Sequence, residues 1–188
     1  ENGYCRVKLA NEISGFVPEV ALRKRLDSDR FLWGKSEERF FVEQGIPEGW
    51  SEEKFRRKVV ECAKGYLGCQ YRWGGKAADG IDCSGVVFMV YLMNGVLIWR
   101  DADIREGYPM KAIWREGEEM CLVEERAKAG DLLFWRGHVG MYLGDGRYLH
   151  CTGHERVFGC RVNSLRRGDE DFRKDLAEAL KVVGSVFS

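Results

Sequence analysis

The sequence predicts an α+β fold in which a helix bearing a candidate nucleophile packs on an antiparallel sheet. Helical patterns come first along the chain and strand-like patterns follow, an order typical of this class. The second helical segment, 83–93, is apolar on nearly every side, which predicts a helix buried at the centre of the domain. Four strand-like runs then lie close together, at 130–135, 138–144, 147–153 and 156–162.

The residues before these elements divide into short strands and a connector. Two strand-like runs within 3–20 are separated by a turn at Asn11. Residues 26–50 are charged and aromatic without clean periodicity, and their three glycines and one proline disfavour a separate core. We therefore expect partial SH3-like strands at 1–25, a connector at 26–50 and the main domain at 51–188.

Capping residues set the expected ends of the helices. Ser51 is a good N-cap for the first helix, and Gly68 is placed to end it. A glycine-rich loop at 71–80 leads to the apolar helix at 83–93, for which Gly95 is the terminator. The end of the chain carries apolar residues at helical spacing, which predicts a terminal helix that docks on the domain. These residues are Phe172, Leu176, Leu180 and Val183.

Composition excludes several classes of partner. Thirty basic residues balance thirty acidic ones, so nothing indicates a nucleic-acid or anionic-membrane surface. No apolar run approaches the roughly 18 residues that span a bilayer. The sequence begins at Glu1 without a signal-like segment, so either a targeting segment has been removed or the sequence starts within a longer gene product. Seven cysteines without a CxxC pair argue against a zinc or redox motif, and we expect buried free thiols.

Cys83 occupies the first turn of the apolar helix. The unsatisfied backbone N–H groups and the positive dipole end at that position stabilise a thiolate, so we expect a thiol pKa below about 8.5. A nucleophilic thiolate also needs a proton carrier. Two of the three histidines, His138 and His150, lie on consecutive expected strands, as a Cys–His site requires. The third, His154, lies in an expected turn and receives no catalytic role.

The two histidines share one face of the sheet only if their hairpin contains an extra residue. With a strict two-residue loop, alternation puts His138 and His150 on opposite faces. A three-residue loop at 144–146, or a bulge, sets His150 opposite Gly140 and makes His138 its diagonal neighbour. The catalytic interpretation therefore predicts such a loop or bulge, with Gly146 in the left-handed region.

Taken singly, each of these features also has a plain structural interpretation. A cysteine at a helix start is most often inert packing, and a histidine in a strand is more often a core or surface residue than a catalyst. Together, five motifs in order resemble the NlpC family of cell-wall cysteine peptidases over about residues 51–163. These motifs are GCQYRWGG (68–75), DCSG (82–85), GDLLF (130–134), HVGMYLG (138–144) and YLH (148–150).

The resemblance implies a papain-like α+β fold that cleaves peptidoglycan stem peptides. The bond usually attacked joins γ-D-glutamate to a diamino acid, meso-diaminopimelate or lysine. Cys83 would be the nucleophile, His138 the base and His150 the residue that orients the base. Tyr71 would place its hydroxyl near the developing oxyanion, beside the backbone N–H of Cys83, and such donors often supply the largest catalytic term. The reaction requires no metal and no organic cofactor.

The resemblance also implies substrate-side residues. Asp82 and Ser84 match family positions that contact the substrate, the acid meeting a free N-terminal ammonium in some members. Asp101 resembles a further such position, although the glutamine usual a few residues later is Arg105 here. Residues 3–22 resemble the closing strands of a bacterial SH3-like module. They are too few for a complete barrel, so they are either part of such a module or unrelated strands.

Three other functions stay open beside the peptidase. The core is also compatible with an amidase or acyltransferase on another substrate, which a wide apolar cleft would favour. A non-catalytic wall-binding module is the second, although the intact cysteine and histidines argue against it. A toxin or effector that needs an immunity partner is the third. The expected partner is peptidoglycan or its peptide fragments, which implies export to the wall or periplasm, or recycling in the cytoplasm.

Overall fold

A computed structural model describes residues 3–8, 14–22, 49–154 and 157–187. The chain divides into two compact units, Glu1–Glu43 and Gln44–Ser188.

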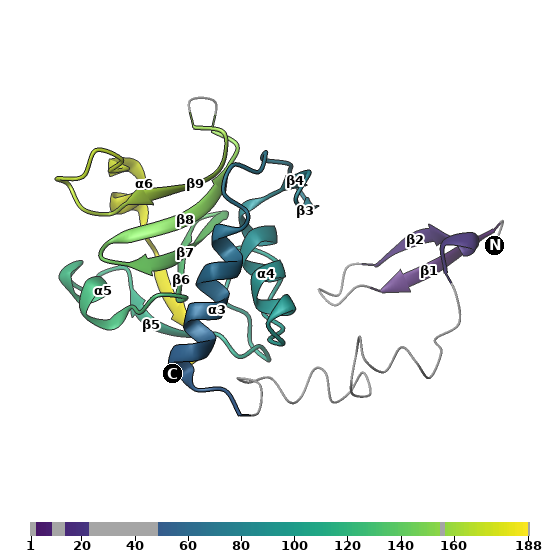
Figure 1. The fold of residues 1–188 in the computed structure, drawn as a ribbon, viewed down its shortest axis with the longest axis horizontal. Coiled ribbons are helices and arrows are strands. Elements are labelled where there is room, and N and C mark those ends of the chain that lie inside the picture. Colours follow the sequence, from purple (N-terminus) through teal and green to yellow (C-terminus); the bar gives the residue numbers. More distant parts are fainter. Residues whose placement is uncertain (1–2, 9–13, 23–48, 155–156, 188) are drawn as a thin grey trace. The chain divides into compact units, whose positions relative to one another are not determined.

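The first unit contains the two strands expected within 3–20. Strand β1 (Tyr4–Lys8) pairs antiparallel with β2 (Ser14–Pro18), and a 3-10 turn at Glu19–Ala21 follows (Figure 1). The turn expected at Asn11 and nearly all of the connector expected at 26–50 lie outside the described residues. The boundaries of these two segments stay predictions.

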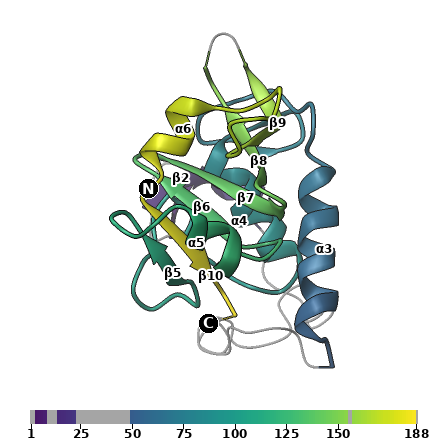
Figure 2. The same ribbon diagram turned by 90° about the vertical axis from the view of Figure 1, so that its left-hand side faces the viewer.

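The second unit is built on an antiparallel six-stranded sheet of order β5-β10-β6-β7-β8-β9 (Figures 1 and 2). Its strands are β5 (Lys111–Arg115), β6 (Leu132–Trp135), β7 (His138–Gly144), β8 (Arg147–Thr152), β9 (Gly159–Ser164) and β10 (Val182–Ser185). Its helices are α3 (Glu52–Lys64), α4 (Cys83–Met93), α5 (Cys121–Arg126) and α6 (Lys174–Ala179). Two short strands, β3 (Lys76–Ala77) and β4 (Gly80–Ile81), pair just before α4. The expected α+β class is confirmed.

Helix α4 has the bounds that the sequence predicts. The Asp82 side chain caps its first turn by accepting a hydrogen bond from the Gly85 backbone N–H at 2.6 Å. Gly95 follows the helix in the left-handed region, with φ 86°. The helix packs on β7 and β8 and against α3. Gly85 is required there, because a β-carbon would lie 2.3 Å from the carbonyl oxygen of Gly75.

Two of the other expected boundaries are wrong. Ser51 caps α3 as expected, by accepting from the Lys54 N–H at 3.2 Å, but the helix ends at Lys64 and not at Gly68. Gly68 lies four residues further on, where its N–H donates to the carbonyl of Cys160. The strand expected at 156–162 is β9 (Gly159–Ser164), which starts later and ends later than predicted.

The expected terminal helix is wrong for most of its length. Helix α6 ends at Ala179, and the chain then forms β10, which pairs with β5 on one side and β6 on the other. Spacing by three and four residues does not distinguish one long helix from a short helix, a turn and a strand. The β-branched residues Val182 and Val183, followed by Gly184, favour the strand.

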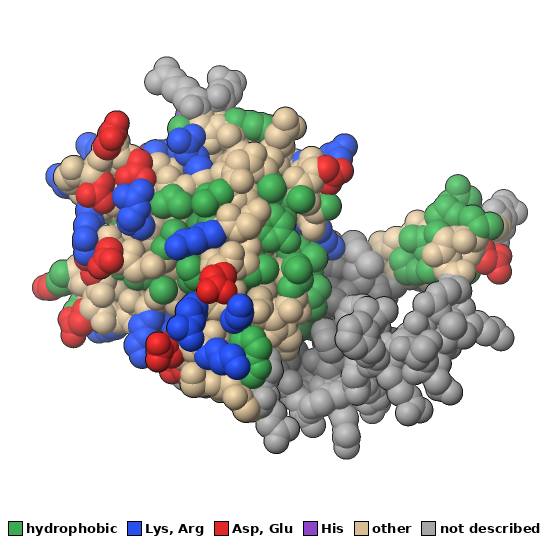
Figure 3. All heavy atoms as spheres, viewed as in Figure 1, with side chains coloured by type: hydrophobic (Ala, Val, Ile, Leu, Met, Phe, Trp, Pro, Cys, Tyr) green, Lys and Arg blue, Asp and Glu red, His purple; other side chains and the backbone are tan. Residues whose placement is uncertain are grey.

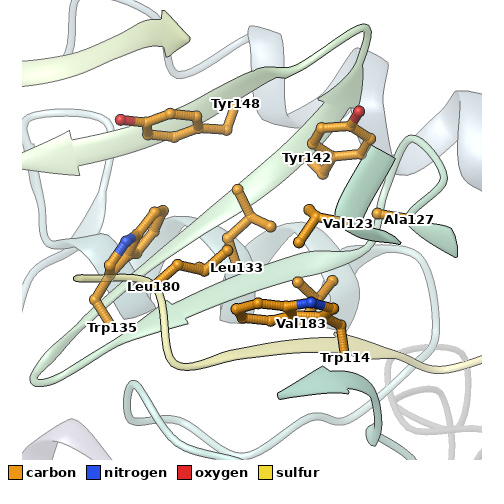
Figure 4. Close-up of a cluster of buried hydrophobic side chains, with 9 residues drawn as sticks. All are labelled: Trp114, Val123, Ala127, Leu133, Trp135, Tyr142, Tyr148, Leu180 and Val183. Atoms are coloured by element: carbon orange, nitrogen blue, oxygen red, sulfur yellow. The ribbon is translucent and has the colours of Figure 1, made fainter. Parts of the chain in front are cut away.

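An apolar cluster fills the space between the sheet and helices α5 and α6 (Figure 4). It is formed by Trp114, Val123, Ala127, Leu133, Trp135, Tyr142, Tyr148, Leu180 and Val183. The aromatic rings of Trp135 and Tyr148 stand 5.3 Å apart between centroids. This cluster supports the sheet face that carries the histidines, since Tyr148 also lies 5.2 Å from the ring of His150.

The surface agrees with the balanced charge of the sequence. On the face shown in Figure 3, acidic and basic side chains are interspersed over the second unit. Within the described ranges, no helix combines the length and apolarity needed to cross a bilayer. All seven cysteines lie among the described residues as free thiols, of which Cys83, Cys151 and Cys160 are buried.

Candidate active site

Cys83 lies at the start of α4 beneath the hairpin that carries the histidines. Its side chain is buried, and the backbone N–H groups of Val139 and Ser84 act on its sulfur. Val139 directly follows His138, so the thiol lies against the start of β7, next to the residue that follows the first histidine.

The expectation of a lowered Cys83 pKa is wrong for the free site. Burial raises the pKa of the Cys83 thiol and outweighs the two backbone N–H groups that lower it. The helix start therefore holds a protonated thiol, because desolvation of the charged form exceeds the stabilisation that the first turn provides.

The hairpin between β7 and β8 contains the extra residue that a shared histidine face requires. Asp145 and Gly146 form its turn with φ 52° and 74°, and a bulge interrupts the register between Tyr142 and Gly144. Gly140 then pairs with His150, as predicted. The prediction of a loop or bulge is confirmed in its bulge form.

Gly140 makes room for the two imidazoles to meet. A β-carbon at this position would lie 2.9 Å from the Leu149 carbonyl oxygen and 3.2 Å from the β-carbon of His150. With glycine there, His138 Nε2 lies 2.7 Å from His150 Nδ1, and the two rings stand at 79°. The structure thus brings the two predicted histidines into direct hydrogen-bond contact.

Asn163 on β9 extends this pair and fixes its tautomers. Asn163 Nδ2 donates to the backbone carbonyl of Asp171 at 2.8 Å, so Oδ1 faces His150 Nε2 at 3.0 Å and accepts a hydrogen bond from its N–H. Neutral His150 then accepts at Nδ1, which makes His138 Nε2 the donor. The remaining lone pair of the His138 ring is on Nδ1, where a base must accept a proton.

Asn163 has no role in the sequence-based predictions. It is 4% exposed and pairs with Tyr148 across β8 and β9. Its signal in the sequence is weak: a polar residue at an alternating position in the strand after His150. The register of β9 depends on contacts with the distant Gly68 and Cys69, which local patterns do not encode.

Both histidines are neutral at neutral pH. Burial lowers the pKa of His138 to about 3, with a smaller contribution from His150. Burial likewise lowers the pKa of His150 to about 4, although the Asn163 side chain partly offsets the effect. The positive charge of Arg173 lowers the pKa of both rings further. The free site is therefore a neutral thiol beside a neutral imidazole.

Acidification is expected to destabilise the fold through His150. Its ordinary pKa of 6.5 is about 4 in the folded protein, so between these values the unfolded chain binds a proton that the folded chain excludes. The contribution of His150 to the free energy of unfolding is complete above pH 6.5 and falls by about 3 kcal/mol as the pH approaches 4. Denaturant unfolding at pH 7 and pH 4.5 measures this effect. His150→Asn should reduce the pH dependence without abolishing it, because the lowered pKa of His138 acts in the same direction; equal slopes for wild type and His150→Asn would contradict the assignment.

Tyr71 lies beside the thiol. It bridges to Ile81 just before the helix, and its ring packs edge-on against Phe158 at 6.0 Å. Burial raises the pKa of the Tyr71 hydroxyl, and a negative charge on Cys83 raises it further. The hydroxyl is thus a protonated donor close to the sulfur, as an oxyanion partner has to be.

Asp82 and Ser84 are turned toward Arg100, a residue that the sequence analysis did not single out. Arg100 Nη2 lies 3.1 and 3.2 Å from the two Asp82 carboxylate oxygens, and Nη1 donates to Ser84 Oγ at 2.5 Å. Asp82 also accepts from the Gly74 N–H at 2.7 Å. Asp101 is exposed, near Lys76. Within the described residues, no group of three His, Cys, Asp or Glu is arranged to hold a metal ion.

Comparison with known proteins places this geometry in a family. The model of the NlpC/P60 family matches residues 68–168. Dipeptidyl-peptidase 6 of Lysinibacillus sphaericus is 45% identical over 139 residues, which cover 73% of this chain and 47% of that protein. The gamma-D-glutamyl-L-lysine dipeptidyl-peptidase of Bacillus subtilis is 36% identical over 119 residues, covering 58% and 37%. The chain spans about half, or less, of the length of these relatives.

Solved structures share the fold at low sequence identity. An NlpC/P60 family protein from Bacillus cereus aligns over 100% of this chain and 52% of its own, with a TM-score of 0.57 and 20% identity. The peptidoglycan hydrolase RipB of Mycobacterium tuberculosis aligns over 90% of this chain and 76% of its own, with a TM-score of 0.52 and 20% identity. Because the matching family model spans more than half of the chain, the chain belongs to the NlpC/P60 family, as its motifs indicated.

Proposed function

We propose that the protein is a cysteine peptidase that hydrolyses peptidoglycan stem peptides at the bond between γ-D-glutamate and a diamino acid. The observation that carries the proposal is the hydrogen-bonded line His138–His150–Asn163 beside Cys83 at a helix start. The relative named for γ-D-glutamyl-L-lysine supports the substrate class. A line of neutral, buried, mutually oriented imidazoles has no evident packing purpose, because apolar side chains would fill the space without desolvating polar atoms.

Acylation begins from the neutral pair. The Cys83 sulfur attacks the γ-carbonyl carbon as the thiol proton passes to His138 Nδ1. The oxyanion accepts hydrogen bonds from the Tyr71 hydroxyl and from the backbone N–H of Cys83. The His138 imidazolium keeps its Nε2–H bond to His150, so the ring stays oriented while it is charged.

Deacylation returns the site to its starting state. Acylation is first completed: the C–N bond breaks, His138 gives its proton to the departing amine of the diamino acid, and the glutamyl group remains on Cys83 as a thioester. Water then attacks the thioester carbonyl while His138 accepts its proton. Collapse of this second intermediate breaks the C–S bond, and the thiolate recovers the proton from His138.

We also assign Asp82, Ser84 and Asp101 to the substrate side of this site. Arg100 engages both oxygens of Asp82 and the Ser84 hydroxyl, so these two residues would contact substrate through a shared network with Arg100. Asp101 is the exposed acid of the set, and it is the better placed to meet a substrate ammonium directly.

Mass spectrometry of reaction products tests the function. The substrates are L-Ala-γ-D-Glu-diamino acid peptides, free and wall-linked, with the α-linked D-Glu isomer as the matched control. We expect cleavage after the γ-linked D-Glu only. Preference for wall-linked peptides would indicate an exported enzyme that acts on the cell wall. Preference for free peptides would indicate recycling of released fragments. Failure to cut any γ-linked peptide, with hydrolysis of lipid or other amides, would replace this function by the amidase alternative.

Asn163→Leu is expected to lower kcat about 10- to 100-fold with little change in KM, since an unanchored His150 leaves the His138 tautomer undefined. Asn163→Asp keeps an acceptor but adds a negative charge that favours imidazolium. On acidification, this variant should therefore lose activity at a higher pH than the wild type does. Steady-state kinetics and ¹⁵N NMR of the histidine rings measure both effects. Asn94→Leu, which alters contacts with Val90 and Cys62 at the far end of α4, is the control. Wild-type kinetics for Asn163→Leu would remove Asn163 from the site.

A further inference from the structure

Two cysteines face each other across β8 and β9. Cys151 pairs with Cys160 in the register of these strands, and their residues are only 0% and 4% exposed. Within the described residues, no other two cysteines are partners in a strand pair. The proposed reaction uses neither thiol, so their juxtaposition has to be explained apart from it.

The backbone bonds of Cys160 show which kind of strand pair this is. The Cys160 N–H donates to the carbonyl of Cys69 at 2.8 Å, and the Cys160 carbonyl accepts from the Gly68 N–H at 2.9 Å. Both groups therefore point away from β8, and Cys151 and Cys160 form a non-hydrogen-bonded pair. In such pairs the α-carbons are about 4.5 Å apart and the side chains are closest. A disulfide bridges α-carbons that are about 4.4–6.8 Å apart, so this pair lies within its range.

The two thiols already interact. Cys151 Sγ donates to the carbonyl of Ile81 at 3.2 Å, so the hydrogen bond that joins the two thiols runs from Cys160 to Cys151. Oxidation would remove both thiol protons. The Ile81 carbonyl would keep the Arg72 N–H as its donor, at 3.0 Å. A disulfide would therefore leave no buried acceptor unpaired at this carbonyl.

The folded protein protects both thiols from reaction. The hydrogen bond with Cys160 and burial both raise the pKa of the Cys151 thiol. The thiolate is the attacking species in thiol–disulfide exchange, so exchange in the folded state is slow. In the unfolded chain both thiols are accessible, and only a short stretch of sequence separates them. A bond between them would form during folding, before β8 and β9 are covered.

We propose that Cys151 and Cys160 form a disulfide when the chain folds in the presence of a low-molecular-weight disulfide, and that this bond clamps β9 to β8. One protein thiolate attacks the small disulfide and releases a small thiol. The second protein thiolate then displaces the other small thiol from the mixed disulfide. The protein loses two electrons and two protons, and the small disulfide becomes two thiols. An oxidising compartment supplies these conditions.

The clamp would hold the strand pairing that brings Asn163 to His150. His150 directly precedes Cys151 on β8, and Asn163 follows Cys160 on β9. The 3.0 Å contact between Asn163 and His150 depends on the register of these two strands. A covalent bond beside this contact would fix the register. The inference does not depend on the peptidase function, because the bond is measured in the protein without substrate.

Refolding with oxidised glutathione tests the proposal. Reduced, urea-unfolded protein is refolded with reduced and oxidised glutathione, alkylated with iodoacetamide in denaturant and digested without reductant. Mass spectrometry should show a linked peptide pair containing Cys151 and Cys160, lighter by two hydrogens than the two reduced peptides together. The thermal midpoint should exceed that of protein refolded with dithiothreitol by at least about 4 °C. Cys160→Ser should lose both effects, and Cys121→Ser, which removes an exposed thiol, should keep both.

The outcomes in the wild type decide the proposal, even where Cys160→Ser does not fold. Alkylation of both Cys151 and Cys160 after refolding with oxidised glutathione would refute it, and so would linkage of either to Cys69. A linked pair without a higher thermal midpoint would refute the clamp. The same peptide map of protein exported through a fused signal peptide checks the result without refolding. Since no measurement involves stem peptides, a failure of the peptidase function would leave these outcomes unchanged.

Discussion

Replacing Cys83 with alanine is expected to lower kcat for stem-peptide cleavage by at least about 10⁴-fold. Without the sulfur no thioester forms, and the histidine pair and the oxyanion donors have no nucleophile to assist. The loss should appear in kcat, because the residues that we assign to substrate binding are unchanged. Circular dichroism should show an intact fold, since alanine fits the first turn of α4 and Asp82 still caps it.

The acyl-enzyme provides a direct measurement of the same prediction. Acid quenching of wild type during turnover should reveal a mass increase of one L-Ala-γ-D-Glu acyl group on the peptide that contains Cys83. Cys121→Ala, which removes an exposed thiol far along the chain from the site, should keep both the adduct and full turnover. Turnover by Cys83→Ala within tenfold of wild type would exclude the covalent mechanism.

Asp131→Ala is expected to cost about 3–5 kcal/mol of unfolding free energy. Asp131 is 1% exposed, and it lies 2.9 Å from Arg56 Nη1 while accepting from the Lys128 N–H at 2.8 Å. Arg56 also donates to the carbonyl of Ala129 and lies over the ring of Phe187. Removing the carboxylate leaves the buried guanidinium with only the partly exposed Glu52 as a counter-charge, at 2.8 Å from Arg56 Nε, where α3 meets the start of β6.

Urea or thermal denaturation measures this loss, and two further variants define its cause. The double variant Arg56→Met with Asp131→Leu should recover most of the lost stability, because it removes both charges and keeps the volume. Glu61→Ala breaks an exposed pair with Lys58 and should change stability by less than about 1 kcal/mol. A loss below about 1 kcal/mol for Asp131→Ala would show that Glu52, water or backbone groups satisfy Arg56 without it.

The elements that the sequence predicts best are those that local chemistry determines. Helix α4 has its predicted ends because Asp82 caps it, Gly95 follows it and its residues are apolar throughout. The bulge before Asp145 follows from a parity requirement: two histidines twelve residues apart reach one face of a hairpin only with an extra residue. Both inferences need nothing beyond neighbouring residues.

What sequence reasoning misses depends on distant contacts. Asn163 meets His150 through the pairing of β9 with β8, and the distant Gly68 and Cys69 also bond to β9 at Cys160. The raised pKa of Cys83 follows from how completely the hairpin covers the helix start, which the dipole argument ignores. Strand β10 escapes prediction because its place is set by the gap between β5 and β6 and not by its own spacing.

The position of β10 bears on when the enzyme becomes active during its synthesis. Every residue of the cysteine–histidine line is translated before Val182, and the strands that carry the histidines and Asn163 pair with one another without β10. Strand β10 joins β5 to this sheet and supplies Val183 to the apolar cluster that supports it. Such pairing across long sequence separations forms slowly. We therefore expect full activity only after β10 has left the ribosomal exit tunnel and completed the cluster.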